Sequence, residues 1–140
     1  MLRLPLNRRA RLALVALVTA TGALPASHAA APAELLAAYT AQAGAPASAE
    51  RGQKLFTTNF GRDFGWSCST CHTATPTGAG KDDLTGKPIA PMAPAANPKR
   101  FTDRSRVDHQ FRLNCKDVVG RECSAGEKAD VLAWLISLTP

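Results

Sequence analysis

The feature that most constrains the fold of this chain is a run of five residues, Cys68-Ser69-Thr70-Cys71-His72. Cys-x-x-Cys-His is the attachment sequence of c-type haem, in which two thiols bond to the porphyrin and the histidine ligates the iron. Two intervening residues let a single helical turn present both sulfurs to one edge of the macrocycle. The sequence therefore predicts Cys68 and Cys71 as the covalent haem attachment residues and His72 as the proximal iron ligand.

Two other kinds of site also use a Cys-x-x-Cys pair. A zinc site needs a second ligand pair at finger-like spacing, and Cys115 and Cys123 are too far apart for that. A thioredoxin-like redox site needs a βαβ context, which the sequence lacks. Covalent haem c is therefore the prediction, and the zinc and redox sites are its alternatives.

The first thirty residues have the pattern of a secretory signal peptide. Arginines at positions 3, 8, 9 and 11 precede an apolar stretch over 12–24, and Ser27-His28-Ala29 offers a small-x-small cleavage site. The apolar stretch is too short and too rich in alanine for a confident membrane anchor, although an uncleaved anchor is the alternative. We expect residues 1–30 to be removed on export, and 31–140 to form one monohaem cytochrome c domain in a bacterial periplasm.

The charge of the chain changes when this segment is removed. The full sequence has 17 Lys and Arg against 11 Asp and Glu, a net charge of +6. The predicted signal carries four of the arginines and no acidic residue, so the remainder has a net charge of +2. Because a nucleic-acid-binding domain needs a basic patch of its own, no nucleic-acid partner is expected.

The mature part, about 110 residues long, is one small domain in which a buried haem would enlarge the apolar core. The fold is predicted to be all-α, with helices at 33–43, about 48–57, about 102–114 and about 125–138. Thr102 is the expected N-cap of the third of these helices, and Ser124 and Glu127 form a capping box at the start of the last. The Pro- and Gly-rich stretch from 73 to 100 predicts an irregular loop at the haem edge. Where the terminal helices cross, we expect Gly52 to lie close to Trp134.

Two cysteines remain after the haem motif is assigned. Cys115 and Cys123 would meet in an oxidising compartment, so the sequence predicts a disulfide that closes a short loop. Two free buried thiols are the alternative.

Met92 and His109 are candidates for the position on the iron opposite His72. Met92 lies in a Pro-flanked loop, as the methionine ligand of an electron-transfer cytochrome does, but it follows His72 by only twenty residues. His109 would give a bis-histidine haem. On an ideal helix, however, its side chain lies about 160° from that of Val107, which favours a solvent-facing histidine.

Asn114 is the third candidate for this position on the iron. Lysines such as Lys81 and Lys87 could also ligate it, but no feature of the sequence points to them. Val107, Phe111 and Asn114 are spaced four and three residues apart, so they share one face of the predicted helix. The asparagine is therefore expected at the end of a buried stripe, where a polar side chain needs a partner. A helix C-terminal cap is the alternative role for it. The sequence pattern alone favours Met92 and Asn114 about equally as the ligand opposite His72.

The stretch from 32 to 138 resembles the sphaeroides haem protein (SHP) family, small monohaem cytochromes of the class I type. The resemblance is most specific in Ile89-Ala90-Pro91, Arg100-Phe101-Thr102-Asp103, Asn114-Cys115, Gly120-Arg121-Glu122-Cys123 and Gly126-Glu127-Lys128-Ala129-Asp130. It implies a high-spin haem whose iron is ligated by Asn114 in the oxidised state. It also implies a disulfide beside that ligand, between Cys115 and Cys123, and no methionine ligand.

The function that this resemblance implies is ligand binding after electron transfer. The protein would take an electron from a partner cytochrome and bind O₂, NO or CO once the weak asparagine ligand leaves. A dihaem cytochrome c, associated with a membrane cytochrome b, is the implied donor. An ordinary low-spin electron carrier with Met92 on the iron is the alternative. Reduction of O₂ or NO is a third reading, for which no acid–base group is evident beside Asn114.

Overall fold

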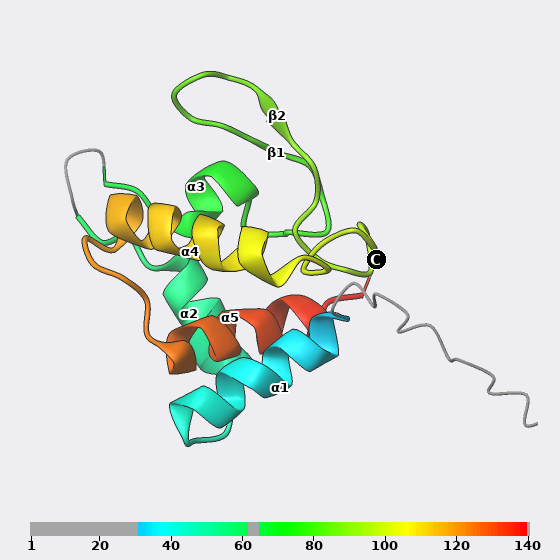
Figure 1. The fold of residues 1–140 in the computed structure, drawn as a ribbon. Coiled ribbons are helices and arrows are strands. Elements are labelled where there is room, and N and C mark those ends of the chain that lie inside the picture. The colour runs from blue at the N-terminus through cyan, green and yellow to red at the C-terminus, as the bar shows by residue number, and fades with distance from the viewer. Residues whose placement is uncertain (1–30, 62–64, 140) are drawn as a thin grey trace, which may run out of the picture.

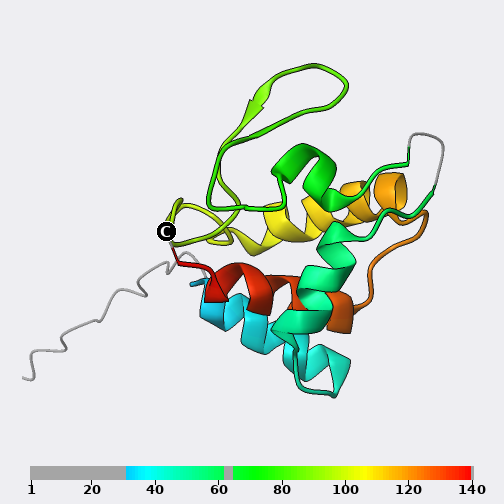
Figure 2. The ribbon, with the colours of Figure 1, turned by 180° about the vertical axis from the view of Figure 1, so that it is seen from behind.

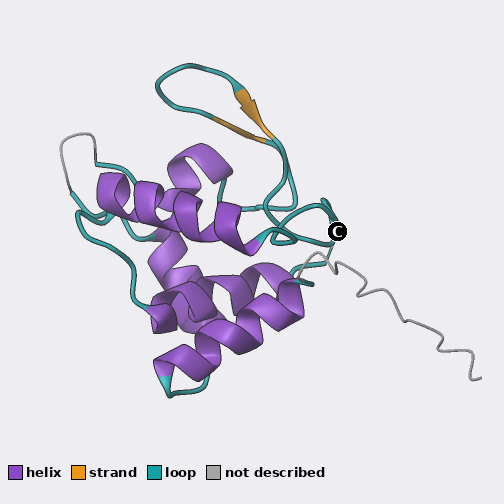
Figure 3. Ribbon diagram, in the orientation of Figure 1, coloured by secondary structure: helices purple, strands orange, loops and turns teal. Residues whose placement is uncertain are grey.

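The computed structural model of the chain describes residues 31–61 and 65–139, so the predicted signal peptide lies outside the described residues. Within these residues five helices and one hairpin follow each other (Figure 1): α1 Pro32–Ala43, α2 Ala49–Thr57, α3 Cys68–His72, β1 Gly80–Lys81, β2 Pro88–Ile89, α4 Arg104–Val118 and α5 Ala125–Ser137. Figure 3 shows how small the strands are beside the helices. The predicted helical fold is confirmed. No helix in the described part of the chain is long and apolar enough to cross a bilayer.

Local capping signals set the ends of three helices. Pro32 occupies the first turn of α1, and Gly44 ends that helix with a φ of 66°, a conformation that glycine adopts without a steric penalty. The Ser48 hydroxyl accepts a hydrogen bond from a backbone N–H at the start of α2. At the start of α5, Ser124 and Glu127 form the predicted capping box.

Helix α4 differs from its prediction at both ends. Its N-cap is Asp103, whose carboxylate accepts from the Arg106 N–H at 3.0 Å, while the Thr102 hydroxyl instead donates to the Lys99 carbonyl. The helix runs four residues beyond 114, to Val118, because the first residue that stops it is Gly120, with a φ of 84°. Position 114 is therefore inside the helix.

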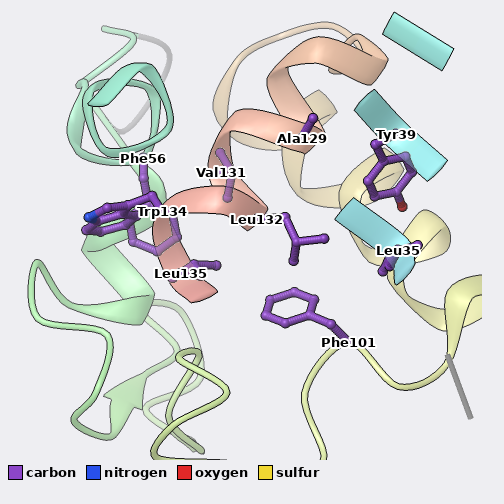
Figure 4. Packing of buried hydrophobic residues seen from close by; sticks show 9 residues of the cluster. All are labelled: Leu35, Tyr39, Phe56, Phe101, Ala129, Val131, Leu132, Trp134 and Leu135. Atoms are coloured by element: carbon purple, nitrogen blue, oxygen red, sulfur yellow. The ribbon is translucent and has the colours of Figure 1, made fainter. Parts of the chain in front are cut away.

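The hydrophobic core lies where α5 packs against α1 and α2, and α1 and α5 are side by side in both Figure 1 and Figure 2. Figure 4 shows Phe56 and Trp134 together at one end of this core and Tyr39 and Leu35 at the other, with Leu132 between them. The buried cluster consists of Leu35, Tyr39, Phe56, Phe101, Ala129, Val131, Leu132, Trp134 and Leu135.

Gly52 marks the point where α2 and α5 cross. A Cβ built on Gly52 would overlap the Asp130 carbonyl oxygen and lie 2.7 Å from the Val131 nitrogen, so the two backbones are in direct contact. The predicted crossing of these helices is confirmed, and the atoms nearest to Gly52 belong to Asp130 and Val131, one turn before Trp134. Trp134 packs against Phe56, one turn after Gly52, with ring centroids 5.0 Å apart.

The stretch after the haem motif contains a short hairpin where an irregular loop was predicted. Strands β1 and β2 are antiparallel, with Gly80 opposite Ile89 and Lys81 opposite Pro88. Asp82 starts the turn, since its carboxylate accepts hydrogen bonds from two backbone N–H groups in the next three residues. Proline is compatible with this ladder because both strands are edge strands. The hairpin extends from the α3 side of the molecule (Figure 2).

Candidate haem site

Helix α3 consists of the five residues of the Cys-x-x-Cys-His motif itself. Cys68 and Cys71 are three positions apart on this single turn, so their side chains lie on neighbouring parts of one face. Both are half-buried and neither belongs to the disulfide, and Cys68 packs against the hydrophobic core. The arrangement is that required for two thioether bonds to one flat apolar group.

His72 is half-buried, and one of its ring nitrogens lies in an environment that offers it no protein partner. Its Nδ1 is buried and has no hydrogen-bond partner among the described residues, and its ring lies 6.2 Å from that of Phe56. Burial, together with the nearby Arg100 guanidinium, lowers the pKa of His72 below its usual value. A lowered pKa favours the neutral imidazole, which is the form that ligates a metal.

The segment that follows His72 packs directly against α3. Thr73 has a φ of 63°, which is rare for a β-branched residue and turns the chain sharply away from the helix. A Cβ on Gly80 would overlap the Cys71 carbonyl oxygen and lie 3.1 Å from the Cα of His72. The base of the hairpin thus fixes the position of α3.

The alternatives to haem find no support at this site. Burial raises the pKa of the Cys68 thiol to about 11, whereas a redox-active pair needs a lowered pKa. Among the described residues, no group of three or more histidine, cysteine or acidic side chains is placed to hold a metal ion. Two cysteines outside the disulfide, a half-buried imidazole that favours its neutral form, and the packing of Cys68 against the core fit covalent haem.

The structure separates the other candidates for the far side of the iron. Met92 is half-buried and packs against the core, and its backbone N–H donates to the Pro76 carbonyl at 2.9 Å. This bond ties the Met92 loop to the segment that directly follows His72. His109 is exposed, as predicted, with Nδ1 3.0 Å from the Arg112 guanidinium. Lys81 and Lys87 are also exposed.

Asn114 lies on α4, and its burial by neighbouring helices, as predicted, is wrong: the protein part of the molecule leaves the residue exposed. Phe111 and Val107 are half-buried against the core, and Cys115 is buried. Asn114 follows Val107 by seven residues and therefore lies within about 20° of it around the helix, so the two residues share one side of α4 as the spacing predicts. The predicted disulfide between Cys115 and Cys123 is confirmed, so α4 is covalently fastened one residue after Asn114.

Sequence reasoning missed a polar contact between α1 and α4. The buried Tyr39 hydroxyl donates to an Asp108 carboxylate oxygen at 2.7 Å, and Lys128 of α5 lies 3.4 Å from the same oxygen. Tyr39 and Asp108 are 69 residues apart in the sequence, and no local pattern points from one to the other.

A small helical domain that presents Cys-x-x-Cys-His on one turn against its core is a c-type cytochrome. Residues 42–135 match the family model described as "Domain of unknown function (DUF1924)". The chain belongs to this family, and its resemblance to the SHP cytochromes is confirmed.

Two relatives show how far the similarity extends. The chain is 56% identical over 106 residues to "Cytochrome c-type protein SHP" of Cereibacter sphaeroides, an alignment that covers 74% of this chain and 81% of the relative. It is 42% identical over 86 residues to "Cytochrome c''" of Methylophilus methylotrophus, covering 61% of this chain and 58% of the relative.

Solved structures agree with these alignments. Oxidised SHP, described as an oxygen-binding cytochrome c, superposes with a TM-score of 0.72 at 53% identity, covering 76% of this chain and 96% of that one. Oxidised cytochrome c'' from M. methylotrophus gives a TM-score of 0.71 at 36% identity, covering 78% and 95%. Since these relatives are monohaem c-type cytochromes, the cofactor of this chain is one covalently attached haem c.

Proposed function

We propose that this chain is an exported monohaem cytochrome c that accepts one electron and then binds O₂ or NO, with Asn114 as a weak sixth ligand of the ferric iron. The observation that carries the proposal is the place of Asn114 next to the Cys115–Cys123 disulfide, in a chain similar to an oxygen-binding cytochrome. Haem c supplies an iron that changes between ferric and ferrous and binds diatomic gases when its sixth position is open.

On the near side of the haem, three residues of α3 would hold the cofactor. The Cys68 and Cys71 thiols would form the thioether bonds, and the imidazole of His72 would ligate the iron. Gly80 supports this role because its close contact with the Cys71 carbonyl leaves α3 little freedom to shift.

On the far side, the proposed role of Asn114 follows from the chemistry of an amide oxygen. This oxygen is a hard, weak-field donor that suits the ferric ion and binds the ferrous ion poorly, so reduction favours its release. The short side chain on a disulfide-fastened helix limits how far the amide can move, and it remains near the iron as a hydrogen-bond donor. Release of a ligand also has a parallel in cytochrome c'' of M. methylotrophus, whose solution structure is described as giving insight into haem-ligand detachment.

The electron donor in this proposal is a dihaem cytochrome c that is associated with a membrane cytochrome b. The proposed compartment is the bacterial periplasm, because both haem c attachment and the Cys115–Cys123 disulfide suit an oxidising, extracytoplasmic environment.

The competing proposal is a low-spin electron carrier with Met92 on the iron. Two observations weigh against it: Met92 packs against the core, and its backbone is tied to the Pro76 segment that follows His72.

The experiment is anaerobic reduction of the holoprotein followed by titration with CO. We expect a ferrous spectrum without a strong-field sixth ligand and rapid, stoichiometric CO binding. A ferrous spectrum that stays six-coordinate and low-spin, with negligible CO binding, would rule out a weak sixth ligand.

A further inference from the structure

Three charged or polar side chains meet where α4 comes against α1 and α5. Tyr39 is only 1% exposed, and its hydroxyl donates a hydrogen bond to Asp108 Oδ1 at 2.7 Å. Lys128 Nζ lies 3.4 Å from the same oxygen and 5.4 Å from the centroid of the Tyr39 ring. Phe111 packs edge-on against Tyr39, with centroids 6.2 Å apart. This cluster is a mixed polar and aromatic contact between three helices.

The charges in the cluster favour an ionised Asp108 and a protonated Tyr39. Burial raises the pKa of the Asp108 carboxyl, but the Tyr39 hydrogen bond and the Lys128 and Arg104 cations outweigh it and lower that pKa. Burial and the neighbouring carboxylate raise the pKa of Tyr39 well above its usual value. Tyr39 therefore stays a hydrogen-bond donor, and a charged acceptor makes that bond stronger than a neutral one.

Helix α4 is attached to its neighbours at Asp108, through polar contacts, and at Cys115, through the disulfide. Asp108 and Cys115 are seven residues apart, so they lie within about 20° of each other around the helix axis. One is joined to α1 and α5 through Tyr39 and Lys128, and the other to Cys123 through the disulfide. Two attachments along one line determine how the helix is rotated about its own axis.

The rotation of α4 determines where the Asn114 amide lies. Asn114 is about 100° around the axis from Cys115, and its amide is about 6 Å from that axis, so a rotation of 10° moves it by about 1 Å. A metal ligand has to be held to within about 0.5 Å of its bonding position. A small rotation is therefore enough to weaken a bond to the iron.

We propose that Asp108 is a positioning residue for Asn114: by joining α4 to Tyr39 and Lys128, it sets the rotation of α4 and so the place of the amide. This inference rests on the proposed role of Asn114 as a ligand. According to this proposal, the 2.7 Å hydrogen bond between Tyr39 and Asp108 strengthens the bond between Asn114 and the iron, in addition to stabilising the fold.

The test compares four variants of the ferric holoprotein by imidazole titration and by amide hydrogen exchange along α4. Asp108→Asn removes the charge, and Tyr39→Phe removes only the hydroxyl and keeps the ring. Asn114→Ala is the reference for a lost ligand. Glu50→Gln is the control, since it also removes one carboxylate but from an exposed position on α2.

A loosened Asn114 competes less well with imidazole. We expect Asp108→Asn and Tyr39→Phe each to lower the apparent imidazole Kd about fivefold, with faster exchange of the α4 amides and more five-coordinate ferric haem. The control should match wild type.

Two outcomes would overturn the inference, and they are distinguishable. If Asn114→Ala tightens imidazole binding while Tyr39→Phe and Asp108→Asn stay within roughly twofold of wild type, only the positioning role is wrong. If Asn114→Ala itself changes nothing, the proposed ligand is wrong and the positioning role fails with it. Should Asp108→Asn not fold, Tyr39→Phe carries the comparison alone.

Discussion

Gly80→Ala should disturb the haem site, although Gly80 follows Cys71 by nine residues in the sequence. The new Cβ would overlap the carbonyl oxygen of Cys71 and lie 3.1 Å from both the carbonyl carbon of Cys71 and the Cα of His72. All three neighbours are backbone atoms, which cannot turn aside as the end of a flexible side chain can. Either the hairpin or α3 must move by roughly 1 Å to reach ordinary carbon–oxygen separations.

The magnitude follows from the cost of overpacking. Forcing atoms into a packed backbone contact costs about 2–3 kcal/mol, and replacing glycine by alanine returns up to about 1 kcal/mol through the unfolded state. We expect the free energy of unfolding of the holoprotein to fall by about 2 kcal/mol. With a urea dependence of about 1.5 kcal/mol per M, the midpoint falls by roughly 1 M. The haem-attached fraction on expression should fall as well, because α3 carries both attachment cysteines.

Gly78→Ala is the matched control in the same loop. Its Cβ would meet only the Thr75 carbonyl oxygen, at 3.5 Å, which is an ordinary contact. Urea unfolding and the ratio of haem absorbance to protein measure both effects. If Gly80→Ala stays within about 0.5 kcal/mol of Gly78→Ala and attaches haem equally well, the close contact between hairpin and α3 is wrong.

Three further predictions concern the scaffold. Gly52→Ala should lower the free energy of unfolding by about 3 kcal/mol, since its Cβ would overlap the α5 backbone, and a thermal or urea midpoint equal to wild type would contradict this. Replacing Cys115 and Cys123 together by serine should cost about 2.5 kcal/mol in urea unfolding under oxidising conditions; no loss would mean that the ring constrains nothing. The pKa of Glu127 is lowered to about 2, chiefly by hydrogen bonds from Arg121, so its contribution to stability is present above pH 4.5 and is lost as the pH falls towards 2. Acid unfolding of Glu127→Gln should lack this step, and an unchanged acid transition would refute the assignment.

Much of the helical fold could be predicted because its signals are local. Gly44 ends α1, and Ser124 and Glu127 begin α5, within a few residues of where the pattern of apolar positions changes. The disulfide was also accessible from the sequence, since only two cysteines remained once the haem motif was assigned. Such features depend on neighbouring residues and not on the arrangement of helices.

The contacts between helices could not be predicted in the same way. Arg51 pairs with Asp130 across 79 positions, and both belong to residue types that are usually solvated on a surface. Arg121, for which the sequence suggested no role, forms a bidentate pair with Glu127. These partners are set by how α2 and α5 cross and by how the disulfide loop folds back.

Asn114 illustrates the limit of periodicity at the site. The four-and-three spacing places it within about 20° of Val107, which packs against the core, yet the protein leaves Asn114 itself exposed. A shared side of a helix therefore does not by itself tell how far along that side the neighbouring helices cover it. The role of Asn114 as an iron ligand stays a prediction.

The proposed ligand is tested most directly by ferric and ferrous absorption spectra of wild type, Asn114→Ala and Met92→Leu. The account predicts a wild-type ferric spectrum without a sulfur-to-iron charge-transfer band, changed by Asn114→Ala in the ferric state alone and unchanged by Met92→Leu. A charge-transfer band that disappears in Met92→Leu, together with an Asn114→Ala spectrum identical to wild type, would contradict it.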